Sequence, residues 1–283
     1  MSFWFFRGLK KGIVTTSYPK WNTEEKCYWN SLLPTVPAYS STTHLADHQL
    51  GHQLVNICPS NALKQEGQEL YLDKGACSAC GRCIEQGGGT LSESATFELA
   101  TTKREALISQ LNTEGMIVRE VADEIKDTIS RTFKRSLHIR TVDTGSCAVC
   151  ESEIRLLSSP YYDLHRLGFF FTPFPRHADL LMITGVGTRA ADQLLRKTYQ
   201  AMPDPKITMA VGACSLEGVL CEDDLVHGAL DKIIPIDVYV PGCPPSPLAL
   251  LNGLLMAVGK FGSFSRNGNL GKIRNHINNR DRR

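Results

Sequence analysis

The stretch LHIRTVDTGSCAVCESEIRLLSS, residues 137–159, decides the fold of the C-terminal half of the chain. Its first part, LHIRTVD, is a short apolar run that predicts a strand, and its last part, CESEIRLLSS, has the pattern of a helix. The pair Cys147-Ala-Val-Cys150 lies where the strand ends and the helix opens. The stretch therefore predicts a strand followed by a cysteine-bearing loop and a helix.

The same alternation continues to residue 262. The further apolar runs are LGFFFTPF (167–174), ADLLMITG (178–185), KITMAVGA (206–213) and IIPIDVYV (233–240). The helical patterns are TRAADQLLRKTYQAM (188–202) and PLALLNGLLMAVGKF (247–261). Runs rich in Ile, Val and Phe that alternate with helices predict a parallel sheet covered by helices, an α/β domain over 137–262.

Length and charge limit the other possibilities. The chain has 283 residues, with 31 Lys and Arg against 29 Asp and Glu, a net charge of +2. This length suggests about two domains, and the near-neutral charge gives no electrostatic reason to expect nucleic acid as a partner. No run approaches the ~18 apolar residues that span a bilayer, and the N-terminus lacks the features of a secretory signal. We therefore expect a cytoplasmic chain.

The remaining segments differ in character. Residues 1–12 combine aromatic and basic side chains, which is typical of a short amphipathic helix on a membrane surface or on a partner, the alternative being a plug into the domain's own core. Residues 13–57 have the composition of extended chain and turns, and residues 58–99 that of small strands and turns. Apolar residues at three- and four-residue steps predict a helical connector over 101–136. The basic tail, 263–283, is expected to be disordered.

The ten cysteines fall into two groups of five, before residue 84 and after residue 146. In a reducing compartment they are more typical of metal or redox sites than of disulfides. A two-cluster ferredoxin repeats Cys-x2-Cys-x2-Cys-x3-Cys-Pro, and the fourth Cys of each run ligates the cluster of the other run. One cluster would therefore need positions that here hold His48, Gly51, Leu54 and Gly87. The other needs Cys58, Cys77, Cys80 and Cys83, and all four are present.

This pattern predicts one [4Fe-4S] cluster on the complete set, with the second cluster erased. A zinc site with four cysteines is the alternative, but it does not account for the Cys58-Pro59 position. The aromatic and basic start, the segment GIVTTSYP (12–19) and this spacing make residues 1–100 resemble the ferredoxin-type subunit of formate hydrogenlyase and respiratory complex I. The resemblance implies a small α+β ferredoxin-like domain whose N-terminal segment lies along a membrane arm.

The second group supplies another set of four. Cys147, Cys150, Cys214 and Cys243 all lie in loops that follow predicted strands. Because ligands collect at the carboxyl ends of the strands in an open parallel sheet, four thiolates can converge there although they span almost a hundred residues.

The motifs GSCAVCESEI, FPRHADLLMITG, MPDPKITMAVGAC and DKIIPIDVYVPGCPPSP resemble the small subunit of group 4 membrane-bound [NiFe]-hydrogenases and its complex I homologue. The resemblance implies a flavodoxin-like α/β fold in which these four cysteines hold the [4Fe-4S] cluster proximal to the active site of a large subunit. Catalytic residues are then expected on the partner and none on this chain. The Cys-x2-Cys spacing is that of the hydrogenase branch, whereas complex I subunits have adjacent cysteines at this point.

Residues outside the two sets of four cysteines also suggest roles. Glu151 and Glu153 are candidates for a proton path, or else form a solvated or salt-bridged helix start. Arg176 and His177 are candidates for tuning the cluster potential. Cys27 and Cys221 are interpreted as buried apolar thiols.

The resemblance implies an electron-transfer subunit that relays single electrons between two [4Fe-4S] clusters and a large subunit, with H2 evolved or oxidised. Further partners would be another ferredoxin-type subunit and membrane-arm subunits, on the cytoplasmic face of the inner or plasma membrane. The alternatives are a complex I-like quinone or carrier oxidoreductase without nickel, and a zinc-stapled scaffold without a redox role.

Overall fold

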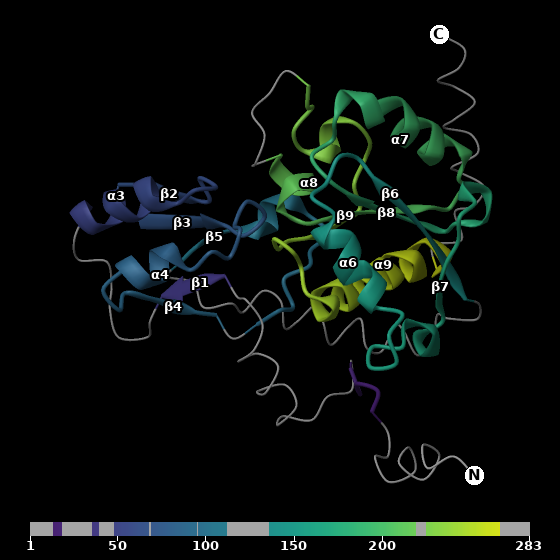
Figure 1. Ribbon diagram of the computed structural model, residues 1–283, viewed down its shortest axis with the longest axis horizontal. Helices are drawn as coiled ribbons and strands as arrows, with labels where there is room; N and C mark the ends of the chain where they lie inside the picture. Colours follow the sequence, from purple (N-terminus) through teal and green to yellow (C-terminus); the bar gives the residue numbers. More distant parts are fainter. Residues whose placement is uncertain are drawn as a thin grey trace.

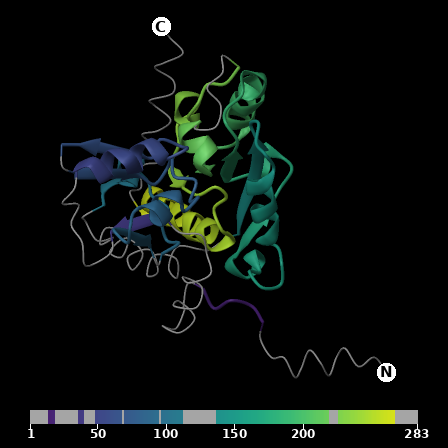
Figure 2. The same cartoon turned by 60° about the vertical axis from the view of Figure 1, so that its left-hand side comes forward.

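A computed structural model describes residues 14–18, 36–39, 48–67, 69–94, 96–111, 136–218 and 225–266. Figure 1 shows an N-terminal part with short strands on the left and a larger sheet with its helices on the right. In Figure 2 the N-terminal part comes forward, with α9 (Pro247–Arg266) in yellow next to it. The predicted amphipathic start, Cys27, residues 112–135 of the predicted helical connector, Cys221 and residues 267–283 lie outside the described residues.

The larger sheet is built from five parallel strands in the order β10-β9-β8-β6-β7. They are β6 (Leu137–Asp143), β7 (Phe169–Phe171), β8 (Leu180–Thr184), β9 (Ile207–Val211) and β10 (Val238–Val240). Every residue of β8 and β9 is buried, because helices cover both faces of the sheet at these central strands. The predicted parallel α/β sheet is confirmed. Numbered along the chain, its strands follow the order 2-1-3-4-5, that of flavodoxin-like sheets.

Helices cover the two faces of this sheet, as Figure 1 shows. On one face, α6 (Val149–Leu156) and α9 pack in one hydrophobic core with Ile139, Met182 and Met209. On the other face, α7 (Arg189–Ala201) and α8 (Ala213–Glu217) pack in a second core with Leu181 and Ile183. The described residues of this half also include three short 3-10 helices: η2 (Leu164–Leu167), η3 (Pro175–His177) and η4 (Leu230–Lys232). Because α9 runs to Arg266, residues 263–266 are helical and do not belong to the expected disordered tail.

In its described residues, the N-terminal part forms small antiparallel sheets and two α-helices. The strands β2 (Leu63–Glu66), β3 (Glu69–Asp73) and β5 (Ile108–Gln110) form one sheet, and β1 (Pro37–Tyr39) pairs with β4 (Leu91–Glu93). The helices are α3 (His48–Ile57) and α4 (Arg82–Gln86). Leu54, Leu63, Leu70 and Leu72 are each at most 2% exposed and form the centre of its core.

Two sequence predictions for this part were wrong. Residues 48–57 form α3 and not extended chain, because Leu50 and Leu54 lie on one helical face and pack into the small core. Residues 104–110 form the 3-10 helix η1 (Arg104–Leu107) and the strand β5, not the first turns of an α-helical connector. Since β5 pairs with β3, this half of the molecule continues past the predicted boundary at residue 100.

The two halves share hydrogen bonds. Thr101 and Tyr239 exchange both backbone bonds, at 3.0 and 2.8 Å, so the first half adds a bridge to the edge strand β10. The Tyr18 hydroxyl donates to Glu98 Oε1 at 3.2 Å and accepts from Asn252 Nδ2 of α9 at 3.3 Å, in a buried cluster. In the described part of the chain, no helix has both the length and the apolar character needed to cross a bilayer.

Candidate metal centres

The first cysteine set comes from three neighbouring elements of the N-terminal part. Cys58 follows α3, Cys77 and Cys80 lie in the loop after β3, and Cys83 lies in the first turn of α4. All four side chains line one pocket. The predicted ligands of the first cluster are therefore brought together.

The surroundings of these sulfur atoms are partly buried and contain backbone donors. The Ala62 amide donates to Cys58 Sγ at 3.2 Å, and the Ala79 amide donates to Cys77 Sγ at 3.4 Å. Burial is the main cause, and charge on the neighbouring cysteines a lesser one, of a pKa of the Cys77 thiol that is raised to about 12. Burial also raises the pKa of Cys83. Such thiols become ligands when a bound metal displaces their protons.

Three of the positions that would ligate a second cluster are described in full, and they are closely packed. A Cβ at Gly51 would lie 2.7 Å from Gln65 Oε1, and Leu54 is 1% exposed within the small core. A Cβ at Gly87 would lie 2.7 Å from the Cys83 carbonyl oxygen. At positions 51 and 87, the Gln65 side chain and the Cys83 backbone carbonyl therefore occupy the space that an extra ligand side chain would need.

The second cysteine set lies at the carboxyl edge of the large sheet. Cys147 and Cys150 follow β6, Cys214 follows β9 within α8, and Cys243 follows β10. The last two loops are joined, since Gly212 N donates to Val240 O and Ala213 N to Gly242 O, both at 2.9 Å. The loop after β6 reaches the same point, because a Cβ at Gly212 would lie 2.8 Å from Cys150 Sγ.

The four thiols of this second set lie close enough to interact electrostatically. Burial raises the pKa of Cys150 to about 12, and charge on Glu151, Cys214, Cys243 and Cys147 adds to the rise. Burial and charge on Cys147 raise the pKa of Cys243 in the same direction.

In neither set do the side chains lie as close together as the ligands of a single metal ion. Within the described residues, no three His, Cys, Asp or Glu side chains lie close enough together to hold one metal ion. The four thiols of the first set instead line the walls of a pocket. A donor set of four thiolates is one that both zinc and [4Fe-4S] clusters use.

Glu151 is held at the second set by two hydroxyl groups. Ser146 Oγ donates to Glu151 Oε2 at 2.8 Å, and Thr184 Oγ1 at the end of β8 donates to Oε1. The sequence analysis missed Ser146 and Thr184, although Thr184 ends a predicted strand at the ligand-collecting edge. Glu153 lies two residues further along α6, half-buried, and burial raises its pKa.

Arg176 and His177 lie elsewhere. Both are exposed in η3, directly before β8, and therefore at the amino end of that strand. The cysteine loops follow the carboxyl ends of the strands, so the structure does not bring these two side chains to the second set. The motif of Arg176 and His177 precedes its strand, whereas the cysteine loops follow their strands. The sequence prediction that these two residues tune the cluster is therefore not supported.

Known proteins resemble the C-terminal half. The family described as NADH ubiquinone oxidoreductase, 20 Kd subunit, matches residues 147–257. Formate hydrogenlyase subunit 7 of Escherichia coli is 44% identical over 145 residues, which cover 51% of this chain and 57% of that protein. The probable membrane-bound hydrogenase subunit mbhJ of Pyrococcus furiosus is 43% identical over 128 residues, 45% of this chain and 77% of that protein.

Among solved structures, a chain of the membrane-bound sulfane sulfur reductase, an archaeal respiratory membrane complex, is 34% identical, with a TM-score of 0.40. The likeness covers 51% of this chain and 77% of that one.

The share of each protein that is matched decides what the comparisons show. The match with formate hydrogenlyase subunit 7 spans little more than half of that protein. The matched family binds a [4Fe-4S] cluster, and all four cysteines of the second set lie within residues 147–257. Through its C-terminal half, the chain belongs to the 20 kDa subunit family of NADH ubiquinone oxidoreductase.

Proposed function

We propose that this chain relays single electrons between two [4Fe-4S] clusters and the active site of a partner large subunit, in a membrane-associated hydrogenase complex that evolves or oxidises H2. The observation that carries the proposal is that one chain gathers two separate sets of four cysteines. The second set lies in a half that belongs to a cluster-binding family.

In this proposal Cys58, Cys77, Cys80 and Cys83 hold the first cluster, within a ferredoxin-like domain that has lost its other cluster. Cys147, Cys150, Cys214 and Cys243 hold the proximal cluster in the flavodoxin-like domain. When bound, each cluster accepts and releases one electron, with potentials that range from roughly −700 to +450 mV among proteins.

The chain's own groups set the surroundings of these sites. Amide donors such as Ala62 N point at sulfur, and buried thiols such as Cys77 and Cys150 keep ligand atoms away from water. Hydrogen bonds to sulfur and low solvent exposure are two of the means by which a protein sets a cluster potential. In the acidic pair of α6, Glu151 accepts hydrogen bonds from two hydroxyl groups, and burial raises the pKa of Glu153.

The hydrogenase branch is favoured by the similarity to formate hydrogenlyase subunit 7 and to mbhJ, and by the Cys147-x2-Cys150 spacing. The partners would be a hydrogenase-type large subunit, a further ferredoxin-type subunit and membrane-arm subunits, at the cytoplasmic face of the membrane. The matched family's description favours one other candidate, a complex I-like oxidoreductase without nickel. Two Cys-x2-Cys pairs in the partner's sequence would support the hydrogenase, and their absence would support the other candidate.

Metal analysis of the anaerobically purified protein tests the proposal. We expect a brown protein with about eight irons per chain, four for each cluster. Replacement of Cys80 or of Cys147 by Ser would each remove about four irons, and both side chains are exposed, so the fold loses little packing. A colourless protein with stoichiometric zinc would refute the relay, and about twelve irons would refute the single cluster in the first half. EPR of the reduced complex would count the clusters and detect nickel in one sample.

A further inference from the structure

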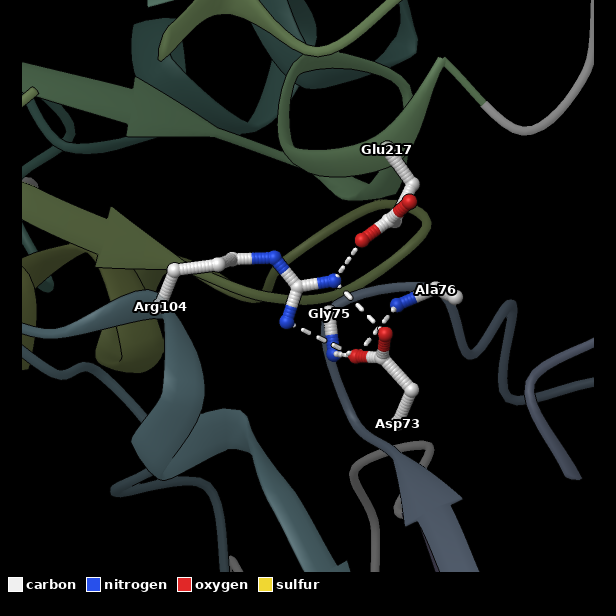
Figure 3. A network of polar contacts seen from close by, with 5 residues as sticks. All are labelled: Asp73, Gly75, Ala76, Arg104 and Glu217. Atoms are coloured by element: carbon white, nitrogen blue, oxygen red, sulfur yellow. Dashed lines mark hydrogen bonds and ion pairs between the residues drawn. The ribbon is translucent and has the colours of Figure 1, made fainter. Parts of the chain in front are cut away.

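Asp73, Arg104 and Glu217 form one network of charged side chains (Figure 3). Arg104 Nη1 donates to Asp73 Oδ1 at 2.9 Å, and Arg104 Nη2 donates to Asp73 Oδ2 at 2.6 Å. The same Nη2 also pairs with Glu217 Oε1. Asp73 ends β3 four residues before Cys77, and Glu217 ends α8 three residues after Cys214. Arg104 therefore connects a segment of the first site with a segment of the second.

Asp73 shapes the turn that carries Cys77. Its Oδ1 accepts from the amides of Gly75 at 2.8 Å and Ala76 at 3.3 Å, as Figure 3 shows. Its backbone oxygen accepts from the amide of Cys77 at 3.1 Å. A change in the position of the Asp73 carboxylate therefore acts directly on the first ligand loop.

The pair between Arg104 and Asp73 is shielded from water. The Arg104 side chain is 12% exposed and that of Asp73 is 8% exposed, whereas Glu217 is 40% exposed. Burial alone would lower the pKa of Arg104, but its hydrogen bonds with Asp73 and the charges of Asp73 and Glu217 raise the pKa overall. Two parallel charge-assisted hydrogen bonds between guanidinium and carboxylate fix geometry as well as charge.

Gly75 gives an independent indication that the fold keeps space for this guanidinium. A Cβ at position 75 would lie 2.9 Å from Arg104 Cζ and 2.9 Å from Nη1. Any side chain there would force the guanidinium away from Asp73. The absence of a side chain at position 75 therefore leaves the space that the guanidinium occupies.

We propose that Arg104 is a positioning residue that fastens the Cys77 turn to the Cys214 helix and so fixes the two cysteine sets relative to each other. Its meaning for electron transfer rests on the proposed function. The backbone bridge between Thr101 and Tyr239 holds the same interface three residues earlier, on the strand that leads to Cys243. The Arg104 side chain adds a contact to the Cys77 turn and to the Cys214 helix at once.

The test uses Glu217→Gln in the full chain, because this change keeps the pair between Arg104 and Asp73 intact. Hydrogen exchange of backbone amides is measured in residues 74–77 and in residues 213–218. We expect exchange in both segments to rise about tenfold, the order that follows from weakening one charge-assisted hydrogen bond. The matched control is Arg196→Gln, which removes an exposed ion pair with Asp192 on α7 and should change neither segment.

A spectroscopic readout accompanies the exchange data. In the fully reduced chain, the magnetic interaction between the two clusters should weaken in Glu217→Gln at unchanged iron content. Arg104→Lys should weaken it as well, because an ammonium group is a point charge that cannot engage both carboxylates as a planar fork does.

Wild-type exchange at residues 74–77 in Glu217→Gln would overturn the proposal, since the two segments would then be independent. So would an unchanged magnetic interaction in both variants. A wild-type chain that binds no clusters would refute the proposed function instead, and the exchange measurement would still decide the role of Arg104.

Discussion

Replacement of Gly212 by Ala is the sharpest single test of the second cysteine set. Gly212 has φ 90° and ψ 154°, a backbone conformation that is essentially restricted to glycine. A methyl group there would lie 2.8 Å from Cys150 Sγ and 3.5 Å from the Gly242 carbonyl oxygen. The substitution therefore acts on the backbone and on a proposed ligand atom at the same time.

The magnitude follows from these two effects. Backbone strain of this kind costs about 1–3 kcal/mol, and overpacking against a buried atom adds about 1–3 kcal/mol. A loss of roughly 2–6 kcal/mol lowers the melting temperature by about 5–20 °C, at ~2–4 °C per kcal/mol for a chain of this size class. Because Cys150 Sγ has to move by several tenths of an ångström, we also expect the second cluster to be lost. Iron content would then fall from about eight to about four per chain.

The assay combines iron analysis with thermal unfolding, and Gly168→Ala is the control. Gly168 also has a positive φ, 81°, but a Cβ there would meet none of the described atoms within 4 Å. The control should lose only the ~1–2 kcal/mol of left-handed backbone strain and keep all its iron. If Gly212→Ala kept full iron content and unfolded at the temperature of Gly168→Ala, the convergence inferred for these loops would be wrong.

Three further predictions concern stability. Tyr18→Phe removes a buried hydroxyl that bonds both halves and should cost about 1–3 kcal/mol in urea unfolding, whereas an unchanged midpoint would mean that this cluster does not stabilise the interface. Gly253→Ala places a methyl group 2.4 Å from Val240 Cγ2 and should destabilise by about 1–3 kcal/mol despite a gain of ~1 kcal/mol in helix propensity. A higher melting temperature for this variant would contradict that packing. Burial raises the pKa of Cys77 and Cys150 from 9.0 to about 12, so the folded iron-free chain holds these protons more tightly than the unfolded chain. That contribution is complete below pH 9 and is lost as the pH rises towards 12. At pH 10 the loss is about 1.4 kcal/mol per thiol. Equal stability of the iron-free chain at pH 8 and pH 10 would contradict this prediction.

The sequence predicted the C-terminal half well because its signals are local. Each strand is a short apolar run, and each proposed ligand follows such a run, so LLMIT and ITMAV identify buried strands without knowledge of the rest. The helix α3 was missed because its ten residues include many polar ones, and a helix this short is stabilised chiefly by packing of Leu54 in the small core.

The connection through Arg104 could not be predicted from sequence. Arg104 and Glu217 are 113 residues apart, and Asp73 belongs to a third segment. No periodicity or spacing relates three charged residues that meet only when two sheets have formed and packed. The same holds for Thr184, whose hydroxyl reaches Glu151 across the sheet edge.

The interface between the halves also bears on why both cysteine sets occur in one chain. β10 is the last strand of its sheet, and an unpaired edge exposes backbone donors and acceptors. Here Thr101 pairs with Tyr239 on that strand, and Cys243 follows the strand after a short loop. Arg104, three residues after Thr101, reaches the turn of Cys77 and the helix of Cys214. One short segment of the first half thus pairs with the open edge at Tyr239 and contacts segments next to both cysteine sets, so contacts within a single chain fix the placement of the two sets.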